Sequence, residues 1–259
     1  MTTESKEQTT PRALPTPGDP NSSQTARATL LLREMVIDGH FRPGERIKEI
    51  PLSSSLGVSR IPLRLALERL AHEGLIEVRP TRGFVVQQFS TTDIYDAIEL
   101  RGSLEGTAAR LAAERLRDGA DLEPLRETSR LIDGLFGKRA LSLASFTSYI
   151  DLNARFHAAM LDLSGSRILR RAVKQVCCLP FASPSAFLLK QRALAGSMDL
   201  FLMALDHHHS IIDAIGNREG MRAENLAREH ARLARRNLDY ALGDREVWKT
   251  IRGAKLVDL

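Results

Sequence analysis

The sequence predicts a mainly α-helical protein in which an N-terminal winged helix-turn-helix precedes a C-terminal all-helical bundle. Three observations lead to this fold class. Only 5% of the 259 residues are aromatic, and the helix-favouring residues Leu, Ala, Arg and Glu recur throughout. Strand signals are confined to residues 75–86, after three helical patterns. From residue 90 onward only helical periodicity remains, which predicts about six or seven helices there.

The N-terminal domain is predicted from successive helix and turn signals. A helical pattern begins near Thr25 and stops at Asp38-Gly39, and a short second helix is expected over residues 50–56. Ser59 is a suitable N-cap for a third helix, and Pro62 falls in its first turn, where the missing N–H is not needed. These signals predict a helix, a tight turn and a helix.

The third helix has two chemically different faces. Leu63, Leu67 and Leu70 recur at helical spacing and predict a buried face, and the opposite face carries Arg60, Arg64 and Glu68. After it, residues 75–78 and 83–86 are rich in Ile and Val and are joined by a turn that contains Arg82. This hairpin is the predicted wing.

Four segments are expected along the chain. Residues 1–22 hold many Pro, Ser and Thr and little apolar surface, which predicts a disordered tail. Residues 23–89 form the predicted winged helix-turn-helix domain and residues 90–245 the helical domain, in which residues 180–198 match no recognisable pattern. Residues 246–259 are expected to be a C-terminal tail.

The composition excludes several classes of protein. With 43% hydrophobic and 27% charged residues, the chain is typical of folded globular proteins. It contains neither a long apolar span nor the apolar core of a signal peptide, so we expect a cytoplasmic protein without a membrane partner. The net charge of +5 suits a polyanionic partner, although many proteins without one share it. The adjacent Cys177 and Cys178 cannot readily bridge, so no disulfide is predicted.

The N-terminal motifs resemble those of the GntR family of bacterial regulators. The resemblance covers about residues 25–88 and is carried by Arg42-Pro43-Gly44-Glu45-Arg46-Ile47, Leu56-Gly57-Val58-Ser59-Arg60, Glu73-Gly74-Leu75 and Arg82-Gly83-Phe84-Val85-Val86. It implies a DNA-binding site made of Ser59, Arg60, Pro62, Arg64, Arg82 and Gly83.

Physical chemistry supports particular roles for these residues. An α-helix fits the major groove, where an arginine such as Arg64 can donate two parallel hydrogen bonds to guanine. Ser59 and Arg60, nearer the start of the helix, suit phosphate contacts. The family usually has Glu after the base-reading arginine, whereas this chain has Leu65, so the family's operator preference does not transfer.

The C-terminal part resembles the all-helical FCD domain of the FadR subfamily. Its motifs are Glu99-Leu100-Arg101, Leu104-Glu105, Asn153-Ala154-Arg155-Phe156-His157, the run from His208 to Ile215, and His230. In that domain an arginine at the position of Arg101 faces the ligand pocket. The resemblance therefore implies that Arg101 and Glu105 bind a small carboxylate effector, which a guanidinium can clamp bidentately. The spacing alone is equally compatible with a surface salt bridge.

Four residues of this domain are candidate metal ligands. Asn153 and His157 lie on one apolar helical stripe, and His208 and His230 lie on the stripes of two further helices, so all four are expected to face inward. They also match the metal positions of the resembled domain, which implies a divalent metal, Zn or Ni. Asn153 stands where the family often has Asp, which predicts weaker cation binding. A hydrogen-bonded core role is the alternative for each histidine.

The function that follows is that of a homodimeric regulator of operator DNA, with repression relieved by a small organic acid. A direct metal-responsive regulator and a purely structural metal are the alternatives within this class. A metal-dependent hydrolase would also need a general base, and neither an HExxH nor a GxSxG pattern occurs. We therefore expect that the protein is not an enzyme.

Overall fold

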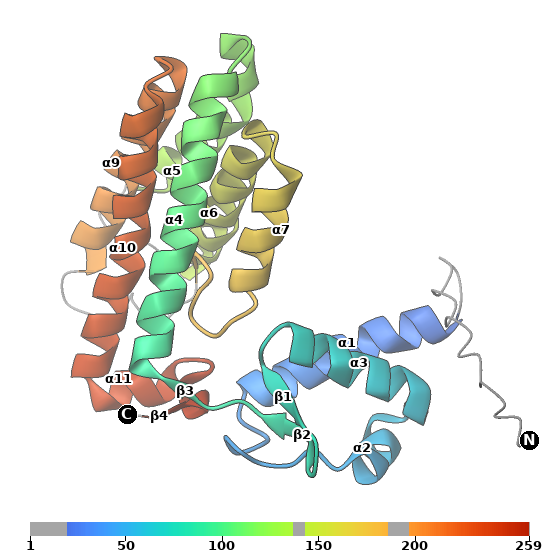
Figure 1. Cartoon of the computed structure of the whole chain (residues 1–259). Coiled ribbons are helices and arrows are strands. Elements are labelled where there is room, and N and C mark those ends of the chain that lie inside the picture. Colours follow the sequence, from blue (N-terminus) through green and yellow to red (C-terminus); the bar gives the residue numbers. More distant parts are fainter. Residues whose placement is uncertain (1–19, 137–142, 186–196, 259) are drawn as a thin grey trace, which may run out of the picture.

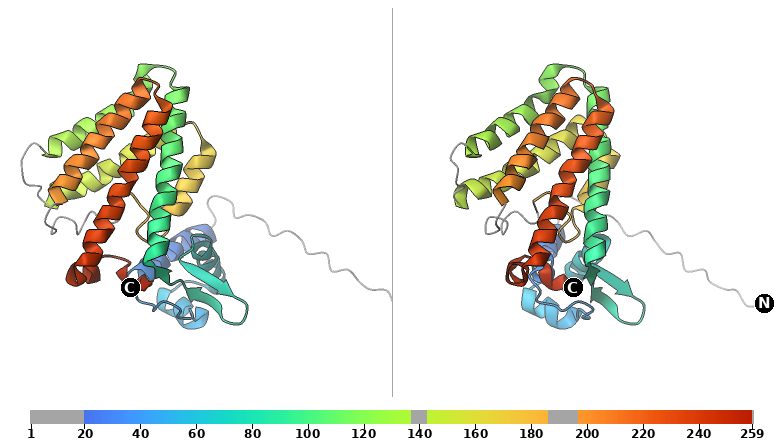
Figure 2. Two further views of the ribbon diagram at one scale, coloured as in Figure 1. Left: turned by 60° about the vertical axis from the view of Figure 1, so that its left-hand side comes forward. Right: turned by 90° about the vertical axis from the view of Figure 1, so that its left-hand side faces the viewer.

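The computed structural model describes residues 20–136, 143–185 and 197–258. Figure 1 shows a bundle of long helices above a smaller N-terminal domain, with the C-terminus between the two. The two views of Figure 2 show the same two-part arrangement. Of the helices in these ranges, none has the length and apolarity needed to cross a bilayer.

The N-terminal domain is a winged helix-turn-helix. Its helices are α1 (Pro20–Ile37), α2 (Glu49–Leu56) and α3 (Arg60–His72), and its wing is the antiparallel pair β1 (Ile76–Arg79) and β2 (Gly83–Val86). Each boundary from α2 onward lies within a residue or two of the prediction, a difference expected for fraying ends. The fold class predicted from the sequence is therefore confirmed.

Two details of this domain differ from the prediction. The tail expected over residues 1–22 falls mostly outside the described residues, but residues 20–22 belong to α1, which begins five residues before Thr25. Ser59 occupies the N-cap position of α3 in an extended conformation, yet its side chain makes no capping hydrogen bond. Helix α3 therefore starts without the predicted cap, and the Ser59 hydroxyl keeps its hydrogen-bonding capacity.

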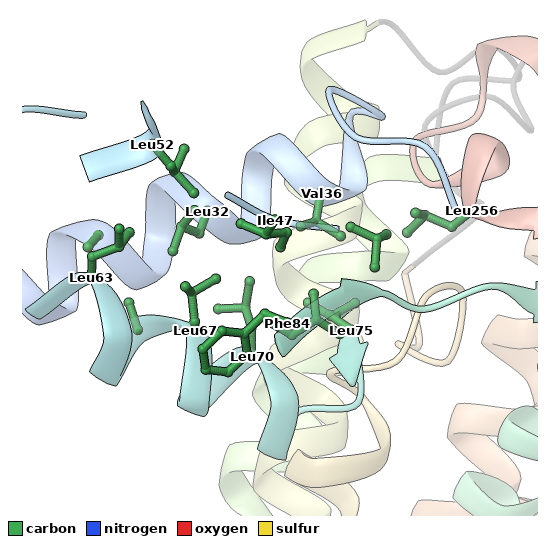
Figure 3. Packing of buried hydrophobic residues seen from close by; sticks show 14 of the residues in the cluster. Leu32, Val36, Ile47, Leu52, Leu63, Leu67, Leu70, Leu75, Phe84 and Leu256 are labelled. Carbon is green, nitrogen blue, oxygen red and sulfur yellow. The ribbon is translucent and has the colours of Figure 1, made fainter. Parts of the chain in front are cut away.

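One apolar core holds this domain together. Leucines from α1, α2 and α3 meet Ile47 and the wing residue Phe84, and Figure 3 shows this packing. An ion pair adds to it, because the Arg33 guanidinium donates two hydrogen bonds, of 2.6 and 3.0 Å, to Glu73 at the end of α3. Leu256, from the opposite end of the chain, is fully buried in the same core.

The helical domain follows a short strand, β3 (Phe89–Ser90). Within the described residues it consists of α4 (Thr91–Arg115), the 3-10 helix η1 (Gly119–Leu122), α5 (Glu123–Phe136), α6 (Leu143–Leu163), α7 (Arg167–Val176), α9 (Ser197–Gly216) and α10 (Gly220–Gly243). Ser90 and Asp93 form a capping box that starts α4. The elements agree with the all-helical domain predicted from residue 90 onward.

Helices α4 and α10 pack along their length, as Figures 1 and 2 show. Two glycines of α4 permit this close approach. A Cβ on Gly102 would lie 2.8 Å from the Cβ of Ala231, and one on Gly106 would lie 2.9 Å from the carbonyl oxygen of Glu224. Because both distances are too short for real contacts, small residues at these positions bring His230 on α10 close to the polar residues of α4.

The prediction of a C-terminal tail over residues 246–259 is wrong for the described residues of this segment. Instead, α11 (Arg245–Thr250), the 3-10 helix η2 (Ala254–Leu256) and β4 (Val257–Asp258) fold back between the two domains. The side chains of Trp248 and Ile251 are buried against α4 and α10. The segment is too short for a clear periodic pattern, so its order depends on these tertiary contacts.

Candidate functional site

A basic groove lies between α3, the start of α2 and the wing. Its volume is about 1010 Å³, and its walls carry five cations, Arg46, Lys48, Arg60, Arg64 and Arg82, against two carboxylates. The excess of positive charge complements the phosphates of nucleic acid. This groove brings together the arginines predicted from the sequence.

The two arginines of α3 project from its exposed face. Arg60 and Arg64 lie opposite the leucines that bury the helix, which agrees with the predicted two-faced pattern. Glu68, one turn further, lies 3.7 Å from the Arg64 Nε atom. Glu68 therefore places a carboxylate near Arg64, whereas the apolar side chain of Leu65, at the next position, cannot do so.

Pro62 does not belong to this surface. It is buried in the first turn of α3, so its role is to shape the helix start and not to contact DNA. At the wing, Arg82 is exposed, and Gly83 has a positive φ of 67°, where an added Cβ would meet nothing within 4 Å. The glycine is therefore required by the turn, and open space surrounds it.

Sequence reasoning assigned no DNA-binding role to Arg46 and Lys48. Arg46 forms an isolated bridge with Val85 of the wing, which holds it at the groove. It belongs to the Arg42–Ile47 motif, so the signal was present in the sequence. The direction of the Arg46 side chain, however, depends on the pairing of its backbone with a strand almost 40 residues further along the chain.

A second site lies inside the helical domain, where three predicted histidines converge. His157 of α6, His208 of α9 and His230 of α10 each offer a ring nitrogen, and these three atoms lie within 4.8 Å of one another. The Nε2 atoms of His157 and His230 are 3.3 Å apart. Two nitrogens of a tetrahedral zinc site lie about 3.4 Å apart, so the Nε2 atoms of His157 and His230 already have the separation that a shared cation requires.

The surroundings of these histidines favour cation binding. His208 is fully buried, stacks on Phe156 at 3.9 Å between ring centres, and neither ring nitrogen has a hydrogen-bond partner. Burial lowers the pKa of His208 and of His230 well below the ordinary value. Both rings are therefore neutral at neutral pH and keep a lone pair for a metal.

Asn153 lies beside the histidines, as predicted. With His157 and His230 it lines a small cavity of about 30 Å³, and its amide N–H groups point at Pro184 O and Ser185 Oγ, each 3.4 Å away. The amide oxygen is the atom that can bind a cation. A cavity of this size holds about one or two waters, so a larger ligand requires its walls to move.

The predicted effector pair, Arg101 and Glu105, occupies different parts of this site. Both side chains are almost fully buried, and an Arg101 guanidinium N–H donates to Glu105 Oε2 over 2.8 Å. Arg101 lines the cavity and its Nε has no partner, whereas Glu105 does not line it. Arg101 therefore fits the predicted ligand-facing position and Glu105 does not.

Glu105 instead contacts a histidine of the triad. Its Oε1 lies 3.1 Å from His157 Nδ1, within ion-pair distance although not aligned as a hydrogen bond. Burial alone would raise the pKa of Glu105, but Arg101 and His157 together outweigh it and lower the pKa to about 2. The carboxylate is therefore ionised at neutral pH, and it lies beside Nδ1 of His157, whereas Nε2 of the same ring lies toward His230.

Comparison with known families covers most of the chain. Residues 24–86 match the gntR family of bacterial regulatory proteins, and residues 96–233 match the FCD domain. Among solved structures, a GntR regulator from a Rhodococcus species shares the fold with a TM-score of 0.53 and 24% identity, covering 86% of this chain and all (100%) of that one. The Listeria monocytogenes regulator Lar shares it with a TM-score of 0.58 and 20% identity, covering 83% and 96%.

Curated relatives are transcription factors. The Nta operon transcriptional regulator of Aminobacter aminovorans is 35% identical over 142 residues, which cover 55% of this chain but only 64% of the relative. The transcriptional repressor RspR of Escherichia coli is 25% identical over 83% of this chain and 87% of its own length. With its basic groove, its winged helix and both family matches, the chain belongs to the GntR family of bacterial transcriptional regulators, with an FCD domain as its helical part.

Proposed function

We propose that this regulator is a homodimeric repressor whose binding to operator DNA is modulated by a small carboxylate effector at a metal-containing site in the FCD domain. The observation that carries the proposal is the buried cluster of His157, His208 and His230, with unpartnered ring nitrogens next to the cavity-lining Arg101. Buried polar atoms normally have partners, so the unpartnered ring nitrogens of three clustered histidines and the unpartnered Nε of Arg101 favour a missing ligand.

The ligands of the metal would be the three histidines and the Asn153 oxygen. Imidazole suits Zn and Ni, and the lowered pKa values of His208 and His230 remove the competing protons. When bound, the ion would supply a Lewis-acidic anchor for a carboxylate. Arg101 would supply the second, cationic contact for the same anion through its unpartnered Nε.

Glu105 acts in this proposal as a positioning residue. Ligating histidines usually place their other ring nitrogen against a carboxylate or carbonyl, which fixes the tautomer and the ring orientation. The 3.1 Å contact between Glu105 Oε1 and His157 Nδ1 provides such a partner. The pair Arg101–Glu105 thus links the effector-facing guanidinium to the metal-facing imidazole.

Two further observations support the homodimer and the repressor role in this proposal. A single winged domain makes few base contacts, so tight operator binding favours a dimer and a two-fold symmetric site. RspR, similar over 83% of this chain, is a repressor by name. Light scattering at micromolar concentration tests the dimer, and a strictly monomeric protein with full operator affinity would contradict it.

A direct metal-responsive regulator is the second candidate, and the size of the cavity favours it. About 30 Å³ accommodates an ion with little rearrangement, whereas an organic acid must displace neighbouring side chains such as Leu200 or Ala204. Operator affinity separates the two functions. A metal sensor changes affinity between the metal-free and the Zn- or Ni-loaded protein, whereas an acid receptor changes it only when a carboxylate is added to the loaded protein.

The experiment that tests the metal site is elemental analysis of protein prepared without a histidine tag. We expect wild type to retain about one divalent ion per chain. The triple variant His157→Ala, His208→Ala and His230→Ala should lose it. His209→Ala is the matched control, because this neighbouring histidine is exposed and pairs with Asp133 at 3.2 Å. Wild type that binds no metal under saturating Zn or Ni would disprove the site.

A further inference from the structure

The C-terminal segment from Arg245 to Asp258 connects the two domains a second time. We call it the strap. It continues directly from α10, with the Asp244 side chain accepting hydrogen bonds from Glu246 N and Val247 N at the start of α11. The chain itself passes from one domain to the other through the linker around β3. The strap thus adds a non-covalent attachment to the linker, beside a further contact in which the Gln175 amide donates to His72 O and Leu179 packs against the core of the DNA-binding domain.

One half of the strap belongs to the FCD domain. Trp248, Ile251 and Ala254 are buried in a cluster with Ile94 of α4 and Leu238 of α10. Gly253, the residue before Ala254, has a φ of 93°, and a Cβ there would lie 3.2 Å from the Phe181 ring. A glycine is therefore needed where the strap turns toward the DNA-binding domain.

The other half belongs to the DNA-binding domain. Leu256 is fully buried in its core, near Val36 and Leu75, as Figure 3 shows. Strand β4 pairs in parallel with β3, with Val257 opposite Phe89. Val257 packs against the cores of both domains. The boundary between the two halves thus falls within a few residues of Gly253.

Polar contacts tie the strap to the end of α1 and to the linker. Arg252 Nε lies 2.7 Å from Asp38 Oδ1, and the Lys255 ammonium donates to the Asp38 carbonyl over 3.4 Å. A Cβ on Gly39 would collide with the Lys255 side chain. The Gln88 amide donates to Asp258 Oδ2 over 3.0 Å.

We propose that the strap holds the DNA-binding domain in one orientation against the FCD domain, and that its release frees the DNA-binding domain to reorient. A linker by itself permits rotation of one domain against the other, whereas non-covalent contacts at separate points oppose it, and the strap makes the largest set of such contacts among the described residues. On the DNA-binding side the strap depends mainly on the burial of Leu256, because its two-residue strand pair and its exposed ion pair are marginal in water. Such a segment opens locally far more readily than the domains unfold.

The strap also joins the DNA-binding domain to the helix that carries His230. A displacement of α10 at the histidine cluster therefore moves the strap and the domain attached to it. This consequence rests on the proposed function, whereas the holding role of the strap does not.

Two variants test the strap in the full-length protein. Leu256→Asp places a charge in the core of the DNA-binding domain and should detach the strap. Insertion of Gly-Ser-Gly-Ser between Ala254 and Lys255 keeps Ala254 with the FCD half and Leu256 with the DNA-binding half, and only slackens the connection between them. Lys249→Ala is the matched control, because Lys249 is exposed and pairs only locally with Glu246.

The readouts are small-angle X-ray scattering and calorimetry. Both variants should show a larger radius of gyration than wild type and a separate melting transition for the DNA-binding domain, while the control shows neither. If Leu256→Asp loses helical circular dichroism, the substitution has disturbed the fold itself. The insertion variant then tests the proposal alone, because it keeps Leu256 in place. Wild-type scattering and a wild-type single transition in the insertion variant would overturn the proposal.

Operator spacing gives a functional readout that depends on the dimer. The wild type should discriminate against a selected operator whose half-sites are moved apart by about five base pairs, half a helical turn. The insertion variant should lose most of that discrimination, and equal discrimination would count against the strap. If wild type proves monomeric or binds neither Zn²⁺ nor Ni²⁺, the proposed function fails, whereas scattering and calorimetry still decide the strap.

Discussion

Two arginine–glutamate pairs of this protein have the same spacing and opposite surroundings. Arg64 and Glu68 lie one turn apart on α3, and Arg101 and Glu105 lie one turn apart on α4. The side chains of the first pair are 65% and 53% exposed and 3.7 Å apart, and those of the second are 2% and 1% exposed and 2.8 Å apart. Sequence spacing therefore identifies an arginine–glutamate pair, but it does not show how much the pair contributes to stability or what its role is.

Solvent explains the difference. Water screens the pair on α3, so its loss has little effect on stability and Arg64 can leave Glu68 for a DNA base. On α4 no water compensates for a missing partner, so removal of one charge leaves the other buried and unpaired. The exposed pair is thus available for exchange with a ligand, whereas the buried pair is a fixed part of the site.

The largest expected effect is on the buried pair. Glu105→Gln should lower the free energy of unfolding by about 3–5 kcal/mol, because Arg101 remains buried without a counter-charge. The matched change Glu68→Gln on α3 should lower it by about 0.5 kcal/mol or less. Urea unfolding followed by circular dichroism measures both, and similar losses at the two sites would break the comparison.

A double variant separates charge from metal positioning. Arg101→Met combined with Glu105→Gln removes both buried charges and should recover much of the lost stability. Its affinity for Ni²⁺, measured by calorimetric titration, should still be about 10–100-fold weaker than that of wild type, because His157 has lost its carboxylate partner. Glu114→Gln, an exposed carboxylate on the same helix, is the control. Wild-type Ni²⁺ affinity in the double variant would refute the positioning role.

The exposed pair should matter for DNA rather than for stability. Arg64→Ala should reduce discrimination at one operator base pair by about 1–3 kcal/mol. Because the side chain is exposed, the free energy of unfolding should stay within about 0.5 kcal/mol of wild type. Mobility shift on operator variants gives the first quantity. An unchanged base preference would show that another residue of the groove reads the DNA.

The smallest expected effect concerns Arg60. If this arginine neutralises one phosphate, Arg60→Ala should reduce the slope of log affinity against log salt by about 0.9 and weaken binding to all sequences alike. The measurement is operator binding over a series of salt concentrations. If Arg60→Ala instead weakens binding to one operator sequence alone, Arg60 contacts a base and does not act through a phosphate.

The two domains also differ in how far the sequence predicts them. In the DNA-binding domain, turns at Gly57 and Gly83 and the leucine stripe of α3 are local signals, and the elements appear where those signals place them. In the FCD domain, the periodicity predicts correctly that His157, His208 and His230 face inward. Two expectations that did not come from periodicity differ from the structure: the C-terminal tail over residues 246–259 folds into short elements, and Glu105, an effector-binding residue by family resemblance, does not line the cavity.

By itself, the sequence determined the helical fold class, the two-faced recognition helix and the inward orientation of the histidines. These properties depend on neighbours within one or two turns, which the chain order specifies. Only the tertiary structure decided that three histidines from α6, α9 and α10 form one cluster, that Glu105 contacts His157, and that Leu256 completes the core of the DNA-binding domain. A helical period shows which face a residue occupies, but the residue across the interface comes from a distant part of the chain.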